Sequence, residues 1–187
     1  MARKILILTE GLSSPHSAKT ACGVIRFRRD EVVGVLDTTV PPQPAQALLE
    51  VGGDLPVVNS LDALPEANVL LIGIAPSGGT LPAPMRALVL GAIERGMDGD
   101  SGLHEFLSDD PEFAAAAAAR ALRLFPMVNA CIEGSPGESI IVHGSVNLGI
   151  AVATDSGLVV PVVRDADLLD LFDLAGAIAD LASRGRD

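Results

Sequence analysis

Aromatic side chains are nearly missing from this 187-residue chain, which has no Trp, no Tyr and five Phe. Its hydrophobic fraction is nevertheless 49%, enough to build a sizeable buried core. That core must come from Val, Ile, Leu and Ala, the residues that dominate buried parallel strands. The shortage of aromatics therefore favours an α/β fold.

Metal-ligating and disulfide-forming residues are also scarce. Cys22 and Cys131 lie far apart in the chain and show no ligand spacing, and His16, His104 and His143 are scattered. The sequence therefore predicts no metal site. Because no export signal is recognisable, we expect both cysteines to be reduced and to serve as small apolar fillers.

Positive charge is in short supply, with 13 Lys and Arg against 24 Asp and Glu and a net charge of −11. Such a surface repels phosphate backbones, so we expect no nucleic-acid partner. No apolar run has the length of a membrane span, so we expect no membrane partner either. The apolar run Ile5–Leu8 after the basic start indicates a first strand rather than a signal peptide, and a cytoplasmic protein.

The N-terminal half alternates short apolar runs with helical stretches. The predicted strands are Lys4–Leu8, Val32–Leu36, Pro56–Val58 and Asn68–Ala75, and the predicted helices are Ala18–Phe27, Pro44–Val51 and Pro84–Arg95. This alternation indicates a parallel sheet with right-handed crossovers. Ligands of such sheets bind at the carboxyl ends of the strands.

The loop after the first strand ends in Lys19 and Thr20 and opens a helix, which is the setting of a phosphate-binding loop. The signature requires glycine where this chain has Ser13 and Ala18. Lys19 and Thr20 are therefore candidate anion contacts. The alternative is an ordinary helix entry that Ser17 caps and in which Lys19 is solvated.

A second loop follows the strongest predicted strand and contains Gly73, Gly78 and Gly79. These glycines would allow the backbone to approach a ligand closely, and we take them as candidate cofactor-binding residues. The alternative is that they only turn the chain before the helix near Pro84.

A helix start follows, with Ser108 or Asp109 as the predicted cap and Pro111 in the first turn. His104 precedes it. This histidine is either a catalytic candidate or a hydrogen-bonded loop residue.

Three segments carry a family resemblance: Lys19-Thr-Ala21, Gly73-Ile-Ala-Pro76 and Gly102-Leu-His-Glu-Phe-Leu-Ser-Asp-Asp-Pro111. They resemble the N-terminal domain of the DUF1611 family, some of whose members are named as N-acetyltransferases of D-glutamate catabolism. The resemblance covers about Arg3 to Phe113 and implies a Rossmann-like fold. It departs at Met97–Asp100, because Asp-Gly-Asp is unsuited to the buried fifth strand of the family.

The C-terminal half begins with six alanines, Ala114–Ala119, in a helix that must end before Pro126. Val128–Ile132 is a short apolar run after it. The later predicted elements are strands at Ser139–His143, Val146–Thr154 and Leu158–Val163, a hairpin turn at Asp155–Gly157, and a final helix at Asp165–Arg184.

Four motifs here carry a second resemblance: Arg123-Leu-Phe-Pro-Met-Val-Asn-Ala130, Val146–Thr154, Gly157–Asp165 and the closing helix. They resemble the catalytic domain of the 2-oxo acid dehydrogenase acyltransferases. That resemblance implies acyl transfer between dihydrolipoamide and coenzyme A, and trimers with active sites between subunits.

Acyl transfer of this kind needs a base for the thiol and a donor for the oxyanion. The family supplies the base from a His-x-x-x-Asp-Gly motif and the donor from a serine, and this chain stops at Asp187 before either. We therefore assign no catalytic residue. The resemblance places Asn147 and Thr154 near the substrate channel, as candidate coenzyme A contacts. The alternative for both is ordinary sheet structure.

The sequence thus predicts a composite α/β chain: a Rossmann-like parallel-sheet domain, residues 1–113, joined through an alanine-rich helix to a mixed-sheet acyltransferase-type fragment, residues 114–187. The leading hypothesis is an acyltransferase-related protein without its catalytic motif, inactive alone, whose partner is a small-molecule acyl donor. The alternatives are a non-catalytic nucleotide- or anion-binding module and an interaction fragment without a ligand. Both sheets lack strands of their parents, so exposed edges favour a homo-oligomer.

Overall fold

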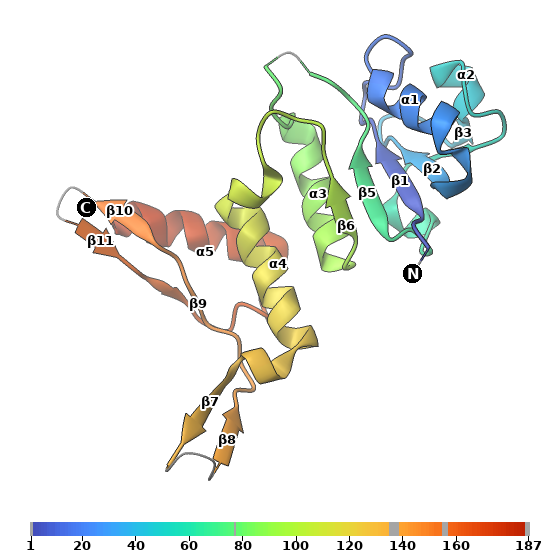
Figure 1. The fold of residues 1–187 in the computed structure, drawn as a ribbon. Helices are drawn as coiled ribbons and strands as arrows, with labels where there is room; N and C mark the ends of the chain where they lie inside the picture. Colours follow the sequence, from blue (N-terminus) through green and yellow to red (C-terminus); the bar gives the residue numbers. More distant parts are fainter. Residues whose placement is uncertain (1, 77, 135–138, 155–156, 186–187) are drawn as a thin grey trace. The chain divides into compact units, whose positions relative to one another are not determined.

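The computed structural model describes residues 2–76, 78–134, 139–154 and 157–185. The chain forms two units, Met1–Asp109 and Asp110–Asp187. Figure 1 shows their elements in sequence colours.

A six-stranded sheet is the framework of the first unit, with strands in the order β3-β4-β2-β1-β5-β6. All neighbours pair in parallel except the short β3, which is antiparallel to β4. The strands are β1 (Ile5–Leu8), β2 (Val32–Leu36), β3 (Gln43–Pro44), β4 (Pro56–Val58), β5 (Val69–Ile72) and β6 (Asp98–Asp100). This order is that of a Rossmann-type sheet, so the predicted fold class is confirmed.

Helices connect the parallel strands. They are α1 (Lys19–Phe27), α2 (Ala45–Leu49) and α3 (Ala83–Glu94), with 3₁₀ turns at Arg29–Glu31, Leu61–Ala63 and Leu107–Asp109. The crossovers from β1 to β2 and from β5 to β6 run in opposite directions along the sheet. Because such crossovers are right-handed, α1 and α3 cover opposite faces.

Aliphatic side chains fill the core of this unit, as the lack of aromatics predicts. All four residues of β1 are buried, and the largest wholly buried side chains around them include Ile25, Leu36, Leu49, Leu55, Ile72 and Met85. Phe27 and Phe106, by contrast, are exposed. The predicted strands at β1, β2, β4 and β5 are confirmed, with ends that differ by a few residues at most.

The Asp-Gly-Asp segment does form a strand, β6, contrary to the expectation from its composition. It pairs with β5 at the edge of the sheet, and Asp98 and Gly99 are exposed. Asp100 forms an ion pair with Arg3. An edge strand has one unpaired side that faces water, and charged side chains are common there, so carboxylates are tolerated where a buried strand would exclude them.

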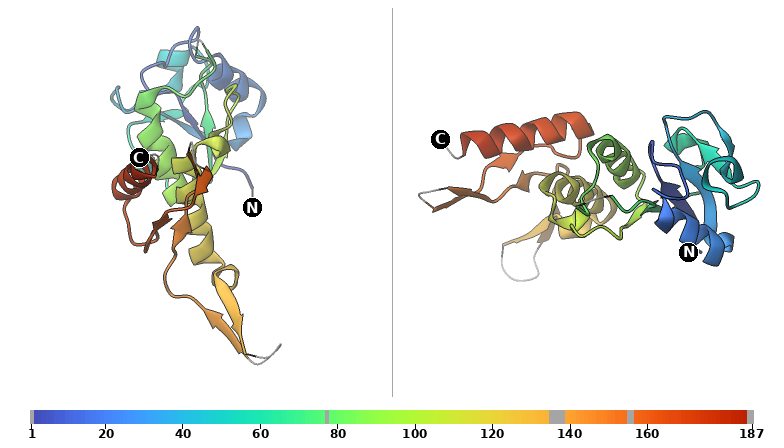
Figure 2. Two further views of the ribbon diagram at one scale, coloured as in Figure 1. Left: turned by 90° about the vertical axis from the view of Figure 1, so that its left-hand side faces the viewer. Right: turned by 90° about the horizontal axis from the view of Figure 1, so that it is seen from above.

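In its described residues, the second unit has two helices and three antiparallel strand pairs. Its elements are α4 (Pro111–Leu124), a 3₁₀ turn at Pro126–Val128, β7 (Ala130–Glu133), β8 (Ser139–Val142), β9 (Leu148–Gly149), β10 (Val152–Thr154), β11 (Gly157–Val159), β12 (Val162–Val163) and α5 (Leu171–Arg184). The pairs are β7–β8, β9–β12 and β10–β11. In Figures 1 and 2 the β7–β8 ribbon points away from both helices, whereas β10 and β11 run beside α5.

Both helices of this unit begin after an aspartate cap. In each case the helix starts later in the chain than the sequence predicts. Asp110, rather than Ser108 or Asp109, caps α4, where its carboxylate accepts the backbone N–H groups of Glu112 and Phe113. The final helix starts after the cap Asp170 and not at Asp165.

The reason for the later start lies at Asp165, whose φ is +50°, outside the helical region. The backbone N–H of Ala166 donates to the carbonyl of Val146 at 2.7 Å. Residues 165–168 are therefore tied to the preceding hairpin instead of continuing the helix.

The two cysteines are free, and they occupy different surroundings. Cys22 is buried on α1, as predicted, and burial raises the pKa of its thiol. Cys131 lies exposed on β7, so its predicted role as a buried filler is wrong. Other apolar residues of the ribbon β7–β8, among them Ile132 and Ile140, are exposed as well.

The packing of α1 onto the sheet depends on Gly73, directly after β5. A Cβ atom here would lie 2.4 Å from Cγ2 of Ile7, 3.0 Å from Cβ of Ala21 and 3.1 Å from the carbonyl oxygen of Leu8. The backbone N–H of Ala21 also donates to the carbonyl of Gly73 at 2.8 Å. The chain passes between strand and helix with no room for a side chain.

We predict that Gly73→Ala destabilises the protein by about 1–3 kcal/mol through overpacking. The matched control is Gly23→Ala on α1, where a Cβ would meet nothing within 4 Å and alanine should stabilise by about 0.5–1 kcal/mol. Urea unfolding followed by circular dichroism measures both. Equal stability of the two variants would contradict the close approach at Gly73.

Candidate functional site

The carboxyl edge of the sheet brings the two sequence-predicted loops together. One loop follows β1 and the other follows β5, and these strands are neighbours. Strand order reverses between them, which makes this edge the topological switch point where open α/β sheets bind ligands. The first unit therefore has the framework of a ligand site.

Lys19 and Thr20 are the first two residues of α1 at this edge. Lys19 is exposed and Thr20 is half-buried. The cap residue is Ala18, and no side chain caps the helix, so the alternative of a Ser17 cap is wrong. Ser17 instead donates its backbone N–H to Oγ of Ser14 at 3.2 Å.

The three glycines of the second loop have different surroundings. The space beside Gly73 is occupied by Ile7 of β1 and Ala21 of α1. Gly79, with φ of +67°, has His104 packed against it, and its carbonyl accepts the backbone N–H of His104 at 2.8 Å. Gly78 is exposed, and a Cβ there would meet nothing within 4 Å. Of the three, Gly78 has the open approach that a ligand requires.

The residue that the sequence prediction missed is Asp37, directly after β2 at the same edge. It is fully buried. Its carboxylate accepts the backbone N–H groups of Gly11 and Thr39, each at 3.0 Å, the hydroxyl of Thr39 at 2.6 Å and the hydroxyl of Ser13. The sequence feature that could have identified Asp37 is its position directly after the predicted strand Val32–Leu36.

Burial alone raises the pKa of Asp37, because the charged form loses water. The hydrogen bonds from Ser13, Thr39 and Gly11 outweigh burial, and the pKa of this carboxyl lies below its ordinary range. Asp37 is therefore ionised at neutral pH.

A second contact closes the same loop. Glu10 accepts the backbone N–H of Thr38 at 2.8 Å and also the Thr38 hydroxyl. Thr9, buried below, places its Oγ1 2.7 Å from Oγ of Ser13. The loops after β1 and β2 are thus joined by side chains from both.

An acid at the end of this strand binds the ribose hydroxyls in Rossmann dinucleotide sites. Here the chain's own Gly11 and Ser13 donate to both oxygens of that acid. The two oxygens that would bind a ribose therefore already accept hydrogen bonds from the loop after β1.

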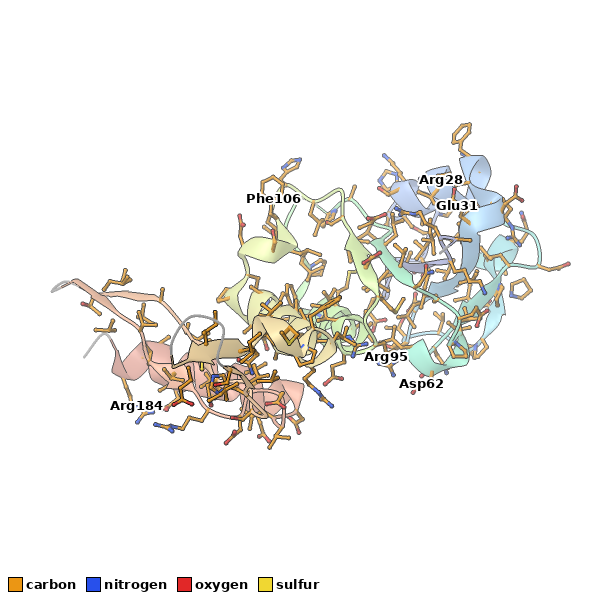
Figure 3. All side chains as sticks on the ribbon, turned by 60° about the horizontal axis from the view of Figure 1, so that its bottom comes forward. Arg28, Glu31, Asp62, Arg95, Phe106 and Arg184 are labelled. Atoms are coloured by element: carbon orange, nitrogen blue, oxygen red, sulfur yellow. The ribbon has the colours of Figure 1, made fainter. Side chains whose placement is uncertain are left out.

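A hollow of about 260 Å³ lies elsewhere, at the amino ends of β5 and β6. Leu61, Leu64, Pro65 and Met97 form its apolar wall, together with Ala67. Arg95 lies at this hollow and pairs with Asp62, as Figure 3 shows. This is the edge opposite the switch point, so none of the predicted site residues lines it.

In the second unit the candidate residues Asn147 and Thr154 lie at the two ends of one ribbon. The side-chain oxygen of Asn147 accepts the backbone N–H of Asp165 at 3.0 Å. The hydroxyl of Thr154 donates to the carbonyl of Gly157 at 2.8 Å. Each residue therefore hydrogen-bonds across the ribbon, at opposite ends, and the structure does not bring the two together.

The three histidines lie at the surface, and the His104 ring lies beside Gly79. His16, His104 and His143 are exposed, and within the described ranges no hydrogen bond or ion pair joins an imidazole to a carboxylate. Among the same residues no group of three or more His, Cys, Asp or Glu could hold a metal ion. No described helix is long and apolar enough to cross a membrane.

We predict that Asp37→Asn destabilises the first unit by about 2 kcal/mol at pH 7, because a charged acceptor of several hydrogen bonds is lost. The low pKa of Asp37 in the folded state makes its contribution complete above the unfolded value of about 3.9 and lost as the pH falls through the folded value. The difference between variant and wild type should therefore shrink in acid.

Urea unfolding at pH 7 and near pH 3 tests this, with Asp54→Asn, an exposed aspartate of the same unit, as the control. Asp54→Asn should change stability little at either pH. A deficit of Asp37→Asn that is equally large in acid would show that its charge is not what matters.

Comparison with known proteins assigns the two halves separately. Residues 42–127 match the family model described as "Domain of unknown function (DUF1611_N) Rossmann-like domain". Residues 111–187 match "2-oxoacid dehydrogenases acyltransferase (catalytic domain)". The two matches share residues 111–127, which lie in and just after α4.

The curated relatives match the C-terminal half. The dihydrolipoyllysine-residue succinyltransferase component of the 2-oxoglutarate dehydrogenase complex of Pseudomonas aeruginosa is 41% identical over 75 residues, 40% of this chain. The corresponding protein of Bartonella vinsonii subsp. berkhoffii is 48% identical over 75 residues. The chain spans 18% of the length of each of these relatives.

A solved structure matches the N-terminal half. A DUF1611 family protein from Anabaena variabilis ATCC 29413 aligns with a TM-score of 0.54 and 28% identity, over 61% of this chain and 33% of that one. Both predicted resemblances are therefore confirmed: the chain is similar to DUF1611 Rossmann-like domains in its first part and to 2-oxo acid dehydrogenase acyltransferases in its second.

Proposed function

We propose that this chain is an acyltransferase-related protein that binds coenzyme A species and does not transfer acyl groups by itself. The observation that carries the proposal is the match of residues 111–187 to the acyltransferase catalytic domain, in a chain whose three histidines lack a His-x-x-x-Asp-Gly context. His16 leads into Ser-Ala-Lys-Thr, His104 into Glu-Phe-Leu-Ser and His143 into Gly-Ser-Val-Asn.

The chemistry of the reaction supports the second part of the proposal. A thiol of dihydrolipoamide must lose its proton as it attacks the thioester carbonyl, and a positioned base speeds that step by about 10²–10⁴-fold. An imidazole acts as such a base when a second group orients it. The three histidines are exposed, and among the described residues none is joined to a carboxylate, so we propose that none of them acts as an oriented base.

The proposed contacts for coenzyme A are Asn147 and Thr154. Asn147 is exposed at the start of the β9–β12 ribbon, and its side-chain oxygen is held by the N–H of Asp165. This bond fixes the orientation of the amide, whose nitrogen carries two donors. Donors of this kind suit the carbonyl and phosphate oxygens of coenzyme A.

A second candidate function is a nucleotide- or anion-binding module in the first unit. The position of Lys19, Thr20 and Gly78 at the switch point favours it. Two features argue against dinucleotide binding at this edge. The Asp37 carboxylate already accepts hydrogen bonds from Gly11 and Ser13, and neighbouring side chains fill the space beside Gly73 and Gly79. We therefore rank it second.

Homo-oligomerisation is a further part of the proposal. The relative from Pseudomonas aeruginosa is named as a component of the 2-oxoglutarate dehydrogenase complex. The strand pairs of the second unit also leave apolar side chains exposed.

Calorimetric titration of the full chain with coenzyme A, acetyl-CoA, ATP and NAD separates the candidates. We expect saturable heat with the two coenzyme A species only. Asn147→Ala should weaken their binding about tenfold, the loss of roughly one hydrogen bond, while Lys19→Ala leaves it unchanged. Binding of ATP or NAD that Lys19→Ala abolishes would instead establish the second candidate.

Turnover is tested with acetyl-CoA and dihydrolipoamide by following free thiol and acetyl-dihydrolipoamide. We expect a rate equal to that of a protein-free control. A rate above this background would refute the absence of a catalytic base.

A further inference from the structure

The hollow of about 260 Å³ at the amino ends of β5 and β6 has no part in the proposed function. Its apolar wall comes from two segments of the first unit: residues 61–67, which include Leu61 and Leu64, and the link between α3 and β6, which contains Met97. Leu61 is 9% exposed, and Leu64 and Met97 are half-buried. The hollow therefore offers a ligand an apolar surface that is partly shielded from water.

Backbone hydrogen bonds hold these two segments in place. The N–H of Met97 donates to the carbonyl of Ala92 in α3 at 3.0 Å. The N–H of the next residue, Asp98, donates to the carbonyl of Asn68 at 2.9 Å, and Asn68 directly follows the lining residue Ala67. The two segments are thus joined to each other, and the hollow is largely pre-formed, as sites for small molecules usually are.

A glycine of α3 provides the space that the lining side chains need. A Cβ atom on Gly91 would lie 2.9 Å from Cδ1 of Leu61 and 3.4 Å from Nη1 of Arg95. The carbonyl of Gly91 also accepts a hydrogen bond from Nη1 of Arg95 at 2.9 Å. Gly91 therefore holds the guanidinium group beside the apolar wall.

The charged part of the hollow is the ion pair between Arg95 and Asp62 (Figure 3). Nη2 of Arg95 lies 2.5 Å from Oδ1 of Asp62, and the two side chains are 38% and 79% exposed. A pair this exposed contributes little to stability, because water solvates both charges. A ligand can therefore replace it at small cost and bind both groups.

These groups define the chemistry of that ligand. A guanidinium binds a carboxylate through two parallel N–H bonds, and a carboxylate accepts hydrogen bonds from an ammonium group. A ligand that carries both groups exchanges one exposed ion pair for two. The apolar wall beside them requires an apolar side chain. A free apolar amino acid combines all three features.

Size and charge favour the same ligand. Liquid water occupies about 30 Å³ a molecule, so the hollow corresponds to about nine water-sized atoms, the size of leucine or methionine. Glu66 and Glu94 are exposed and adjoin lining residues in the chain. Because they repel a ligand of net negative charge, a zwitterion is favoured over a carboxylate that has no amine.

We propose that this hollow binds a free apolar amino acid of the size of leucine or methionine. Its carboxylate lies on Arg95 and its ammonium group on Asp62. Its side chain lies against Leu61, Leu64 and Met97. The site belongs to the first unit, at the edge opposite the switch point, and is independent of coenzyme A binding.

NMR of the full chain with isotope-labelled methionine methyl groups tests the proposal at the site itself. Met97 lies at the hollow, and Met127 is an exposed residue of the second unit. We expect leucine to shift the Met97 resonance, identified by its loss in Met97→Leu, with saturation and to leave that of Met127 in place. A Met97 resonance that leucine does not move, or that moves together with that of Met127, overturns the proposal.

Two variants test the charged groups. Arg95→Gln and Asp62→Asn should each weaken leucine binding at least tenfold, because each removes one of the two ion pairs with the ligand. The matched control is Arg28→Gln, at an exposed arginine of the same unit that pairs with Glu31 outside the hollow, and it should bind leucine like wild type. Far-UV circular dichroism confirms that each variant is folded. Leucine binding that neither Arg95→Gln nor Asp62→Asn weakens contradicts the assignment of these groups.

Three analogues test each part of the ligand. Isocaproate is leucine without its amine, isoamylamine is leucine without its carboxylate, and alanine lacks most of the apolar side chain. Each should bind at least tenfold more weakly than leucine. Isocaproate that binds as tightly as leucine, and equally to Asp62→Asn, would make the hollow a site for simple carboxylates and overturn the amino acid as its ligand.

Discussion

A strand buried in a protein interior needs hydrogen-bond partners along both of its edges, because an unpaired buried N–H or C=O costs free energy. β1 meets this condition with β2 on one side and β5 on the other, and its four apolar residues are wholly enclosed. The close passage at Gly73 lets α1 seal the same strand. This strand is at the centre of the first unit. At the carboxyl edge of the sheet, the connecting loops occupy the space in which a ligand of such a fold would bind.

Hydrogen bonds within the protein occupy this edge next to β2. Asp37 is saturated by Gly11, Ser13 and Thr39, so the loop after β1 is held down over the end of β2. Similarity to a Rossmann-like domain therefore does not by itself imply a dinucleotide site. The open part of this edge is limited to the surroundings of Lys19, Thr20 and Gly78.

The described strands of the second unit are not joined into one sheet. Its strands pair two by two, and an isolated two-stranded ribbon is only marginally stable in water. In the ribbon β9–β12, Val152 and Val163 are buried, whereas Leu158, Val160 and Val162 are exposed. The two family matches overlap within 111–127, and we propose that the sequence passes from one family to the other in the alanine-rich part of α4. Alanine suits this place because it favours any helix and specifies no particular neighbour.

The sequence by itself determined the elements whose residues agree with local rules: the aliphatic strands, the helix that Pro126 ends, and the four motifs of the second half. The tertiary structure decided the rest, because the partners are distant in the chain. Asp98–Asp100 forms a strand because it pairs with β5. Asp165 is not helical, because the backbone N–H of its neighbour Ala166 donates to the carbonyl of Val146 in the hairpin. Asp37 accepts hydrogen bonds from Gly11 and Ser13, which lie more than twenty residues away in the chain. Local propensity cannot encode such contacts, since they arise only where the fold brings separate segments together.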